Sequence, residues 1–247
     1  ARYRQVSGQP KAVEPGQSEM IVFKRTEGLR LPVSAATAVS VSLRRRLIAL
    51  ADEHDTMTSL IHGHDCDPHC AYVPLPFVAG HQHADGHLMG VAIVVPAKAE
   101  PGDRQKVYQA VAHLESFGLP GSLGHWRVQL TNGYAPQTLQ SKTWVSKSAR
   151  WGTVTPLVLD RHPRGNRSVK DIVTSACRDV GLPEPAEVES GLYSTFRGVP
   201  AATRFRPLKH TKGRPMVHAT ITFSEPVAGP ILLGAGRYFG LGLLRAV

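Results

Sequence analysis

Cysteine is scarce in this 247-residue chain, which contains only Cys66, Cys70 and Cys177. Three cysteines do not make the disulfide framework of a small secreted protein, so a reducing cytoplasm is the expected location. No apolar run reaches about 18 residues and the first residues lack the pattern of a signal peptide, which argues against a membrane span or secretion. The chain begins with Ala1 instead of Met, so we expect a trimmed product or the downstream part of a longer polypeptide.

Acidic residues are scarce in the second half. Residues 141–247 carry 7 Asp and Glu against 16 Lys and Arg, whereas residues 1–140 carry 12 against 13. Histidine is distributed the other way, because seven of the twelve lie between His54 and His87. The surplus cations predict a polyanion-binding surface, and the histidines are candidates for acid–base chemistry near neutral pH. The alternative is that the net charge of +10 only keeps the protein soluble.

Apolar segments typical of strands alternate with amphipathic segments typical of helices in the first half. Ser34 and Asp103 are expected to cap the two helices, and Gly118 to end the second. The order is that of a ferredoxin-like (RRM-like) unit, in which two helices back a four-stranded antiparallel sheet. The predicted elements are a strand at 20–24, a helix at 35–53, strands at 70–78 and 88–95, a helix at 104–118 and a strand at 125–130.

The second half partly repeats this order after a loop at residues 131–149. In place of a second long helix it has only the segment 229–241, followed by a terminal apolar strand. We therefore predict an α+β protein with two ferredoxin-like βαββαβ halves in tandem, residues 1–135 and 136–247, the second with its last helix shortened. The other elements predicted there are strands at 153–159, 187–195 and 216–223 and a helix at 168–181.

The most distinctive stretch is GPILLGAGRYFGLGL at residues 229–243. Its glycines permit close backbone approach to a ligand, while an arginine offers a phosphate partner and a tyrosine a stacking face for a base. A P-loop is not indicated, because the spacing is not GxxxxGK[ST] and no long helix follows. A tight corner of small residues is the alternative. The RNA-binding candidates here are Gly234, Gly236, Arg237, Tyr238, Gly240 and Gly242.

Several blocks of the sequence resemble the repeat-processing endoribonucleases of CRISPR systems, in the repeat-associated mysterious protein (RAMP) superfamily. The glycine-rich loop is shared by the superfamily, whereas the other blocks point to the downstream half of the type I-U (I-G) fusion of a backbone-capping subunit with the processing nuclease. The resemblance covers nearly the whole chain from about Val22. The blocks are GPILLGAGRYFGLGLL at 229–244, FVAGHQHADGHLMGVAIVVP at 77–96, WGTVTPLVLDRHP at 151–163, GLPEP at 181–185 and FRG at 196–198.

The resemblance implies metal-independent cleavage of precursor CRISPR RNA within its repeats, leaving 2′,3′-cyclic phosphate (or 3′-phosphate) and 5′-hydroxyl ends. CRISPR repeat RNA is then the expected partner, together with other subunits of a type I effector complex (Cascade), and no cofactor or membrane is expected. The alternative from another class is a non-catalytic subunit that holds CRISPR RNA in a surveillance complex.

Cleavage without a metal needs a base for the 2′-hydroxyl, an acid for the leaving oxygen and a cation for the charged phosphorane. Family enzymes place their histidine at or after the first helix, which points to His64 and His69 ahead of His54 and His62. His81, His83 and His87 form a second candidate group, and the side chains of His81 and His83 would project to the same side of an extended segment. The catalytic candidates are therefore His64, His69, His81 and His83, and the alternative is that they only satisfy hydrogen bonds of loops.

Two other kinds of site are weaker interpretations. A dense knot of residue types that suit zinc occurs within nine residues, but structural zinc sites have two well-separated ligand pairs, so no metal is predicted. His218-Ala-Thr220 would suit a two-histidine phosphoesterase, but the first half contains no convincing second H-x-[ST] motif. The residues of the knot are His62, His64, Cys66, His69 and Cys70.

Further cations are expected to hold RNA. Arg45 belongs to three consecutive arginines of the first predicted helix, which cannot all share one face. Lys142, Lys147 and Arg150 lie in the loop between the halves, where Trp144 and Trp151 would add stacking faces for unpaired bases. The basic run RFRPLKHTKGR at 204–214 is expected to contact the backbone of an RNA stem.

Overall fold

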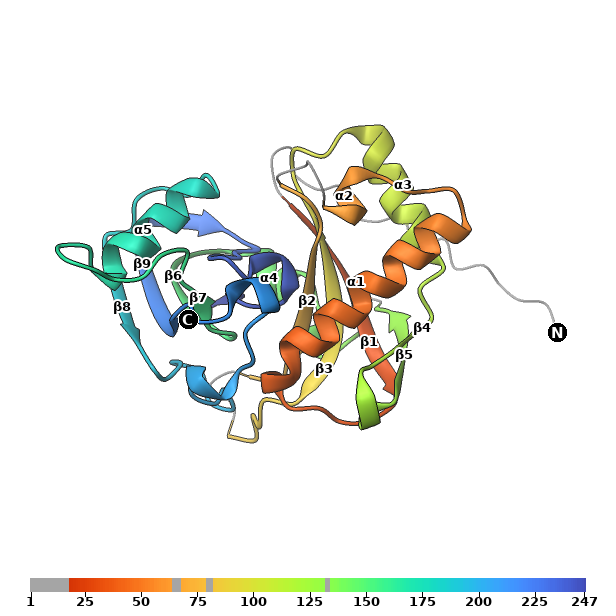
Figure 1. Ribbon diagram of the computed structural model, residues 1–247, viewed down its shortest axis with the longest axis horizontal. Helices are drawn as coiled ribbons and strands as arrows, with labels where there is room; N and C mark the ends of the chain where they lie inside the picture. Colours follow the sequence, from red (N-terminus) through yellow and green to blue (C-terminus); the bar gives the residue numbers. More distant parts are fainter. Residues whose placement is uncertain (1–17, 64–67, 79–81, 132–133) are drawn as a thin grey trace.

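Two antiparallel β-sheets, one from each half of the chain, lie side by side in the computed structural model (Figure 1). The structure describes residues 18–63, 68–78, 82–131 and 134–247. The mixed α/β architecture with antiparallel sheets confirms the class expected from the sequence. No helix of these described ranges is both long enough and apolar enough to cross a membrane.

The first sheet has the strand order β2-β3-β1-β5-β4. Alternate strand residues point to opposite faces, and each face is covered by a different layer. Phe23, Tyr72 and Ile93 pack with Leu43 of α1 on one face, whereas the other face lies under Trp144. The elements of this half are β1 (Glu19–Glu27), η1 (Val33–Ala35), α1 (Ala36–Glu53), α2 (Ser59–His62), β2 (Ala71–Pro76), β3 (Leu88–Val95), α3 (Pro101–Ala112), β4 (Ser116–Gly118), η2 (Gly121–Leu123) and β5 (His125–Leu130).

The second sheet has the order β10-β6-β9-β7, and β8 also pairs with β9. One core of this half joins Ile172 and Val173 of α5 to Ile221 of β9, with Ile231 and Leu233 from the glycine-rich segment beside them. The elements are η3 (Gln137–Leu139), α4 (Lys142–Val145), β6 (Lys147–Thr153), β7 (Leu157–Val158), α5 (Val169–Asp179), β8 (Glu187–Gly191), η4 (Ala202–Arg204), η5 (Lys209–Thr211), β9 (Met216–Ala228), η6 (Arg237–Phe239) and β10 (Leu244–Ala246).

The two halves share a sequence of pairings. In the first half the neighbours run β5-β1-β3-β2, and in the second they run β10-β6-β9-β8. When β4 and β7 are set aside, the first and third strands of each half lie at the centre and the second and last strands flank them. The short turn η6 stands where the second half would have its last helix, as the sequence indicated.

Some predicted boundaries in the first half are wrong. Ser34 lies within η1, and α1 begins at Ala36 without a capping side chain. Asp103 does not cap α3 but lies in its first turn, because Pro101 already starts the helix with its fixed φ. Gly118 does not end that helix: the chain leaves it after Ala112 and returns as β4, which buries Phe117 against Trp126.

In the second half the predicted strand 153–159 is divided. β6 already begins at Lys147, inside the expected loop, because it pairs with the distant strand β9. Pro156 has no N–H to donate, and the chain resumes as the two-residue strand β7 beyond it. The predicted helix is confirmed, since Ser168 caps α5 in a reciprocal box with Asp171.

The two halves also pack directly on each other. Val158, Phe205 and Leu241 of the second half belong to the same apolar cluster as Leu43 of α1. The buried guanidinium of Arg245 in β10 donates a hydrogen bond to the carbonyl of Val78, just after β2. The junction is thus a packed interface, and the side chains along its rim keep fixed neighbours from both halves.

Candidate functional site

The glycine-rich segment of residues 229–243 contacts the first half and forms one wall of the candidate site. Gly240 has a positive φ of 76°. A Cβ atom there would lie 2.5 Å from Cδ of Pro74 in β2 and would collide with the hydroxyl of Ser40 in α1. Glycine alone permits both this backbone conformation and this close approach.

The other candidate glycines of this segment are buried within the second half. The Cα atoms of Gly234 and Gly236 face Val158 of β7, and the N–H of Gly242 donates to the carbonyl of Pro156 at 2.9 Å. Their packing matches the alternative interpretation, a tight corner of small residues. The part of the segment that reaches the surface is the turn η6.

His69 and Tyr238 lie against each other at the junction. Their ring centroids are 3.6 Å apart and their planes differ by 25°. A Cβ atom on Gly63 would lie 2.9 to 3.0 Å from three atoms of the imidazole, and such equal distances put Gly63 over the ring face and not at its edge. Tyr238 covers one face of the imidazole, so Gly63 must cover the other face. Hydrogen bonds and proton transfer therefore occur at the ring edge, where the two nitrogen atoms lie.

The tautomer of His69 follows from its backbone contact. Nδ1 lies 2.9 Å from the carbonyl oxygen of Cys70, which can only accept a hydrogen bond. Nδ1 therefore carries the proton, and in the neutral ring the lone pair is on Nε2. An imidazole fixed in this way can take a proton at Nε2.

The buried side chain of Tyr72 and the partly buried side chain of Arg44 hold the short helix α2, which Gly63 caps at its C-terminus. The hydroxyl of Tyr72 donates to the carbonyl of Ile61 at 2.9 Å, and the guanidinium of Arg44 donates to the carbonyl of His62. Burial raises the pKa of the Tyr72 phenol well above its usual value, so it stays a donor. These contacts fix Gly63 above His69.

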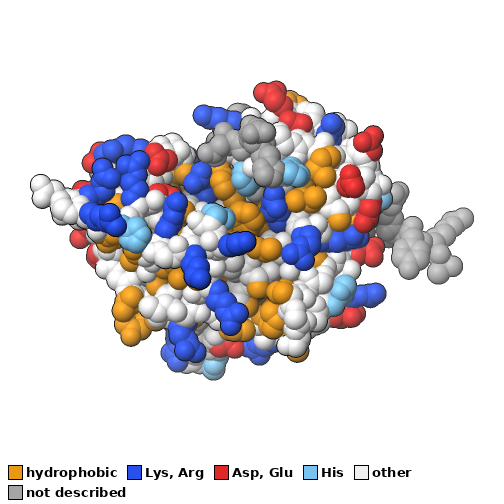
Figure 2. Space-filling view, in the orientation of Figure 1, with side chains coloured by type: hydrophobic (Ala, Val, Ile, Leu, Met, Phe, Trp, Pro, Cys, Tyr) orange, Lys and Arg blue, Asp and Glu red, His pale blue; other side chains and the backbone are white. Residues whose placement is uncertain are grey.

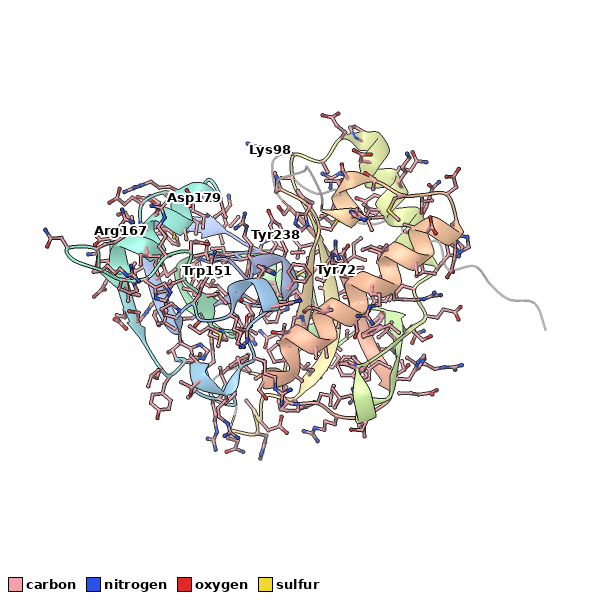
Figure 3. The ribbon with its side chains drawn as sticks, in the orientation of Figure 1. Tyr72, Lys98, Trp151, Arg167, Asp179 and Tyr238 are labelled. Carbon is pink, nitrogen blue, oxygen red and sulfur yellow. The ribbon has the colours of Figure 1, made fainter. Side chains whose placement is uncertain are left out.

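Cations and aromatic rings surround this pair. The guanidinium carbon of Arg237 lies 4.6 Å from the ring centroid of Tyr238, and that of Arg44 lies 5.6 Å from the ring centroid of Phe239. His210 meets the same Phe239 ring edge-on at 6.0 Å. Figure 2 shows Lys and Arg side chains spread across this face, with histidines among them where the halves meet. Figure 3 marks the position of Tyr238 at this junction.

The basic run 204–214 borders the same surface. The carbonyl of Arg206 accepts a hydrogen bond from the Thr37 hydroxyl of α1 at 2.9 Å, and Arg214 donates to the carbonyl of Asp160 at 3.0 Å. Burial raises the pKa of the Asp160 carboxyl, and the nearby guanidinium groups of Arg237 and Arg214 partly offset that rise. The surface by Tyr238 is therefore rich in positive charge.

The second predicted histidine group lies at the other end of β2. This strand has six residues and separates the groups by roughly 20 Å. The ring of His83 is 3.0 Å from the Gln82 amide, and His87 is 2.5 Å from Asp85, which also pairs with Arg30. The hydrogen bond from His87 is the main reason that the pKa of Asp85 is lowered.

Several predicted residues fall outside what the structure describes. His64 and His81 are two of them, as is Cys66 of the zinc alternative. Within the described ranges, no group of three or more His, Cys, Asp or Glu side chains is placed to hold a metal ion.

His218 is a core histidine. It is 1% exposed, and Nε2 donates to the carbonyl of Pro200 at 3.1 Å. Nδ1 lies 2.9 Å from the Thr153 hydroxyl, which therefore donates to it. Burial lowers the pKa of His218 to about 4. The phosphoesterase alternative thus has no accessible histidine on this strand.

The cations of the linker region belong to α4 and β6. Lys142 belongs to α4, which lies over the face of the first sheet opposite to α1, and Lys147 follows it at the start of β6. Arg150 pairs with Glu189 at 3.8 Å. The stacking role expected for the tryptophans is wrong: Trp144 and Trp151 are fully buried and pack in the cores. Arg45 is exposed on α1.

A model of the CRISPR-associated protein GSU0054 family matches residues 16–246. The chain belongs to this family. No curated protein matches the sequence.

One solved structure shares the fold of this family member, and two others align with it at lower TM-scores. A "CRISPR associated protein Cas6" aligns over 93% of this chain and 98% of its own length, with a TM-score of 0.50 and 7% identity. A Cas6 product complex aligns over 94% and 100%, with a TM-score of 0.47 and 15% identity. A Cas6-related protein from Pyrococcus furiosus aligns over 94% and 98%, with a TM-score of 0.41 and 9% identity.

Some residues of the site were missed in the sequence. Arg44 was one of three adjacent arginines, and only the structure separates it from Arg45 by its contacts with His62 and Phe239. The sequence did not indicate the roles of Gly63 and Tyr72, because these roles depend on the position of α2 above β2. The HGH sequence at residues 62–64, with its central glycine, was the one available hint.

Proposed function

We propose that this CRISPR-associated protein is an endoribonuclease that binds precursor CRISPR RNA and cuts it within each repeat at the junction of its two halves. The observation that carries the proposal is the stack of His69 on Tyr238 beside Arg237. It brings a proton-transfer group, a stacking face and a phosphate partner together from opposite halves of a chain whose family is CRISPR-associated.

The proposed chemistry uses an internal nucleophile. A base removes the proton of a 2′-hydroxyl, the 2′-oxygen bonds to the adjacent phosphorus, and the bond from phosphorus to the 5′-oxygen breaks. An acid then protonates the leaving 5′-oxygen, so that the products are a 2′,3′-cyclic phosphate and a 5′-hydroxyl. Nε2 of His69 is suited to one of the two proton transfers. Arg237 and Arg44 supply positive charge for the phosphorane.

The finer assignments belong to the same proposal. The shared strand order supports two ferredoxin-like units, residues 1–135 and 136–247. The chain would correspond to the nuclease half of the type I-U (I-G) fusion and would remain with CRISPR RNA in a type I effector complex. His64, next to the described site in sequence, stays a second catalytic candidate.

One variant pair tests the proposal. Repeat RNA incubated with the wild-type protein should yield one discrete cut, and His69→Ala should slow it by about 10²- to 10⁴-fold, the usual contribution of an acid or base. The dissociation constant should change by less than about threefold, which is under 1 kcal/mol. His83→Ala is the matched control, since His83 is exposed at the other end of β2, and it should cut at the wild-type rate.

A non-catalytic RNA-holding subunit is the competing function. This function is favoured by the packing of Tyr238 and Gly63 on the two faces of the His69 ring, because a purely structural histidine would be packed in the same way. If the wild-type protein binds repeat RNA tightly but leaves it intact, the holding function is correct. If His83→Ala loses cleavage while His69→Ala keeps it, the site is at the hairpin and not at the junction.

A further inference from the structure

A groove beside α5 lies outside the site described above. It has a volume of about 350 Å³ and runs between the helix and the segment that precedes it. Figure 3 labels Arg167 and Asp179 on this side of the molecule, away from Tyr238. Arg161, Lys170 and Arg178 also line it, and its lining contains no aromatic side chain.

Four cations and four acids line this groove, the acids being Asp160, Asp171, Asp179 and Glu184, and Arg164 lies beside it as a fifth cation. Asp171 accepts hydrogen bonds from Ser168, and Glu184 pairs with Arg178 at 3.1 Å. Within the described part of the chain, the remaining cations have no carboxylate oxygen within 4.0 Å, and all of them are exposed. They are Arg161, Arg164, Arg167 and Lys170.

The groove begins where the junction ends. Asp160 lines the groove, and its carboxyl lies close enough to Arg237 for that guanidinium to influence its charge. Arg214, at the border of the junction, donates to the Asp160 carbonyl, while the N–H of Ala235 donates to the carbonyl of Val158 in β7. Arg237 and Arg214 therefore both act on the charge of the Asp160 carboxyl, where the junction meets the groove. Figure 2 shows Lys and Arg side chains along this part of the surface.

We infer that the groove beside α5 binds the phosphate backbone of the RNA strand that flanks the cut, with Arg161, Arg167 and Lys170 as its phosphate partners. Cations without aromatic neighbours contact phosphates and carry no base preference. The inference rests on the proposed function, because it takes the junction as the place from which the strand leaves. It adds a second, sequence-independent subsite.

Binding of uncleavable repeat RNA, with a 2′-deoxy sugar at the cut site, tests this subsite. Arg161→Glu/Arg167→Glu should bind the full repeat about tenfold or more weakly, and the slope of log K against log salt should fall by roughly 1.4 for two lost phosphates of a single strand. The matched control is Lys106→Glu/Arg127→Glu, the same charge change on exposed residues of α3 and β5. The control should bind within about twofold of the wild type.

Shortened RNA separates a local contact from general repulsion. RNA that lacks the flanking segment on one side of the cut should bind the wild-type protein more weakly, and Arg161→Glu/Arg167→Glu should then cause no further loss. Equal losses on full and shortened RNA, or none on either, would overturn the inference. Arg164→Glu/Lys170→Glu, with unfolding temperature as a check, covers the case in which the first variant fails to fold.

The outcomes also distinguish this inference from the proposed function. A protein that binds RNA through the groove but never cuts it refutes the nuclease and keeps the subsite. A protein whose His69→Ala variant stops cutting, but whose groove variants bind every RNA like the wild type, keeps the nuclease and refutes the subsite. Loss of a protein partner without loss of RNA affinity assigns the groove to protein and overturns the inference as well.

Discussion

The two ends of β2 carry similar histidine-rich sequences but have different surroundings. At its start, His69 stacks on Tyr238 from the other half of the chain, and Arg237 lies over the ring of Tyr238. At its end, His87 is held by Asp85 within the hairpin that carries it. The comparison teaches that residue type does not distinguish an acid–base candidate from a structural histidine. The distinction comes from what the second half brings to each end.

The charges at the two ends differ in the same way. The hairpin brings the Asp85 carboxylate to His87, and Arg30 pairs with the same carboxylate. At the junction, Arg237 lies over the ring of Tyr238, on which His69 stacks, and Arg44 lies over the ring of Phe239. The junction therefore offers positive charge of the kind that a phosphate and a developing phosphorane need.

The largest expected effect is on the pH dependence of stability and concerns His218, a histidine with a structural role. Its pKa is about 4 in the folded protein and about 6.5 when unfolded, so the unfolded chain takes up a proton first as the pH falls. The stability it contributes is complete above pH 6.5 and is lost down to about pH 4, a loss of roughly 3 kcal/mol.

Urea unfolding of the wild type and His218→Gln at pH 7 and pH 4.5 measures this contribution. The wild type should lose more stability on acidification than the variant, and cleavage by His218→Gln at pH 7 should stay within about twofold. A variant with the same pH dependence as the wild type would show that His218 is not buried in its neutral form.

The next effect concerns the cover of His69. Gly63→Ala adds a Cβ atom that must displace the imidazole, and a displacement of about 1 Å costs cleavage roughly 100-fold. Gly181→Ala is the control, because Gly181 also has a positive φ, 81°, but has open space for a Cβ atom. Single-turnover rates should fall for Gly63→Ala alone. Equal rates for both variants would contradict the idea that packing between Gly63 and Tyr238 positions the imidazole of His69 for catalysis.

The smallest effect is that of a chelator. If histidines carry out the proton transfers, EDTA should leave the cleavage rate within about twofold, since no metal-bound water is needed. A loss of about 100-fold that zinc restores would instead favour the metal alternative at residues 62–70. The same assay on His69→Ala shows whether the variant has lost a zinc ligand or an acid or base. Added zinc would change the cleavage rate of the variant only if His69 is a ligand.

Local sequence signals predicted much of the fold. The strands β1, β3 and β5 and the helix α5 depend on the pattern of neighbouring residues, and all four predicted elements are confirmed. β4 and the start of β6 were missed because each exists through its partner, β5 and β9 respectively. The same reason applies to Trp144 and Trp151, whose burial depends on layers supplied by distant segments.

The candidate site was predictable in its residue types but not in its arrangement. His69, Arg237 and Tyr238 stood out by composition, yet nothing in the sequence indicated that the first stacks on the third. Gly240 carried the decisive contact, since its close packing on Ser40 and Pro74 brings η6 to the start of β2. A contact of this kind between halves has no local signature.

The most direct test of the central claim is a structure of the protein with repeat RNA that carries a 2′-deoxy sugar at the cut site. The account predicts that the scissile phosphate or the modified 2′ position lies at the junction, within hydrogen-bond reach of His69 Nε2, about 2.6 to 3.2 Å or one water away. The guanidinium of Arg237 should contact that phosphate. A scissile phosphate beside His83 and His87 at the far end of β2 would contradict the account.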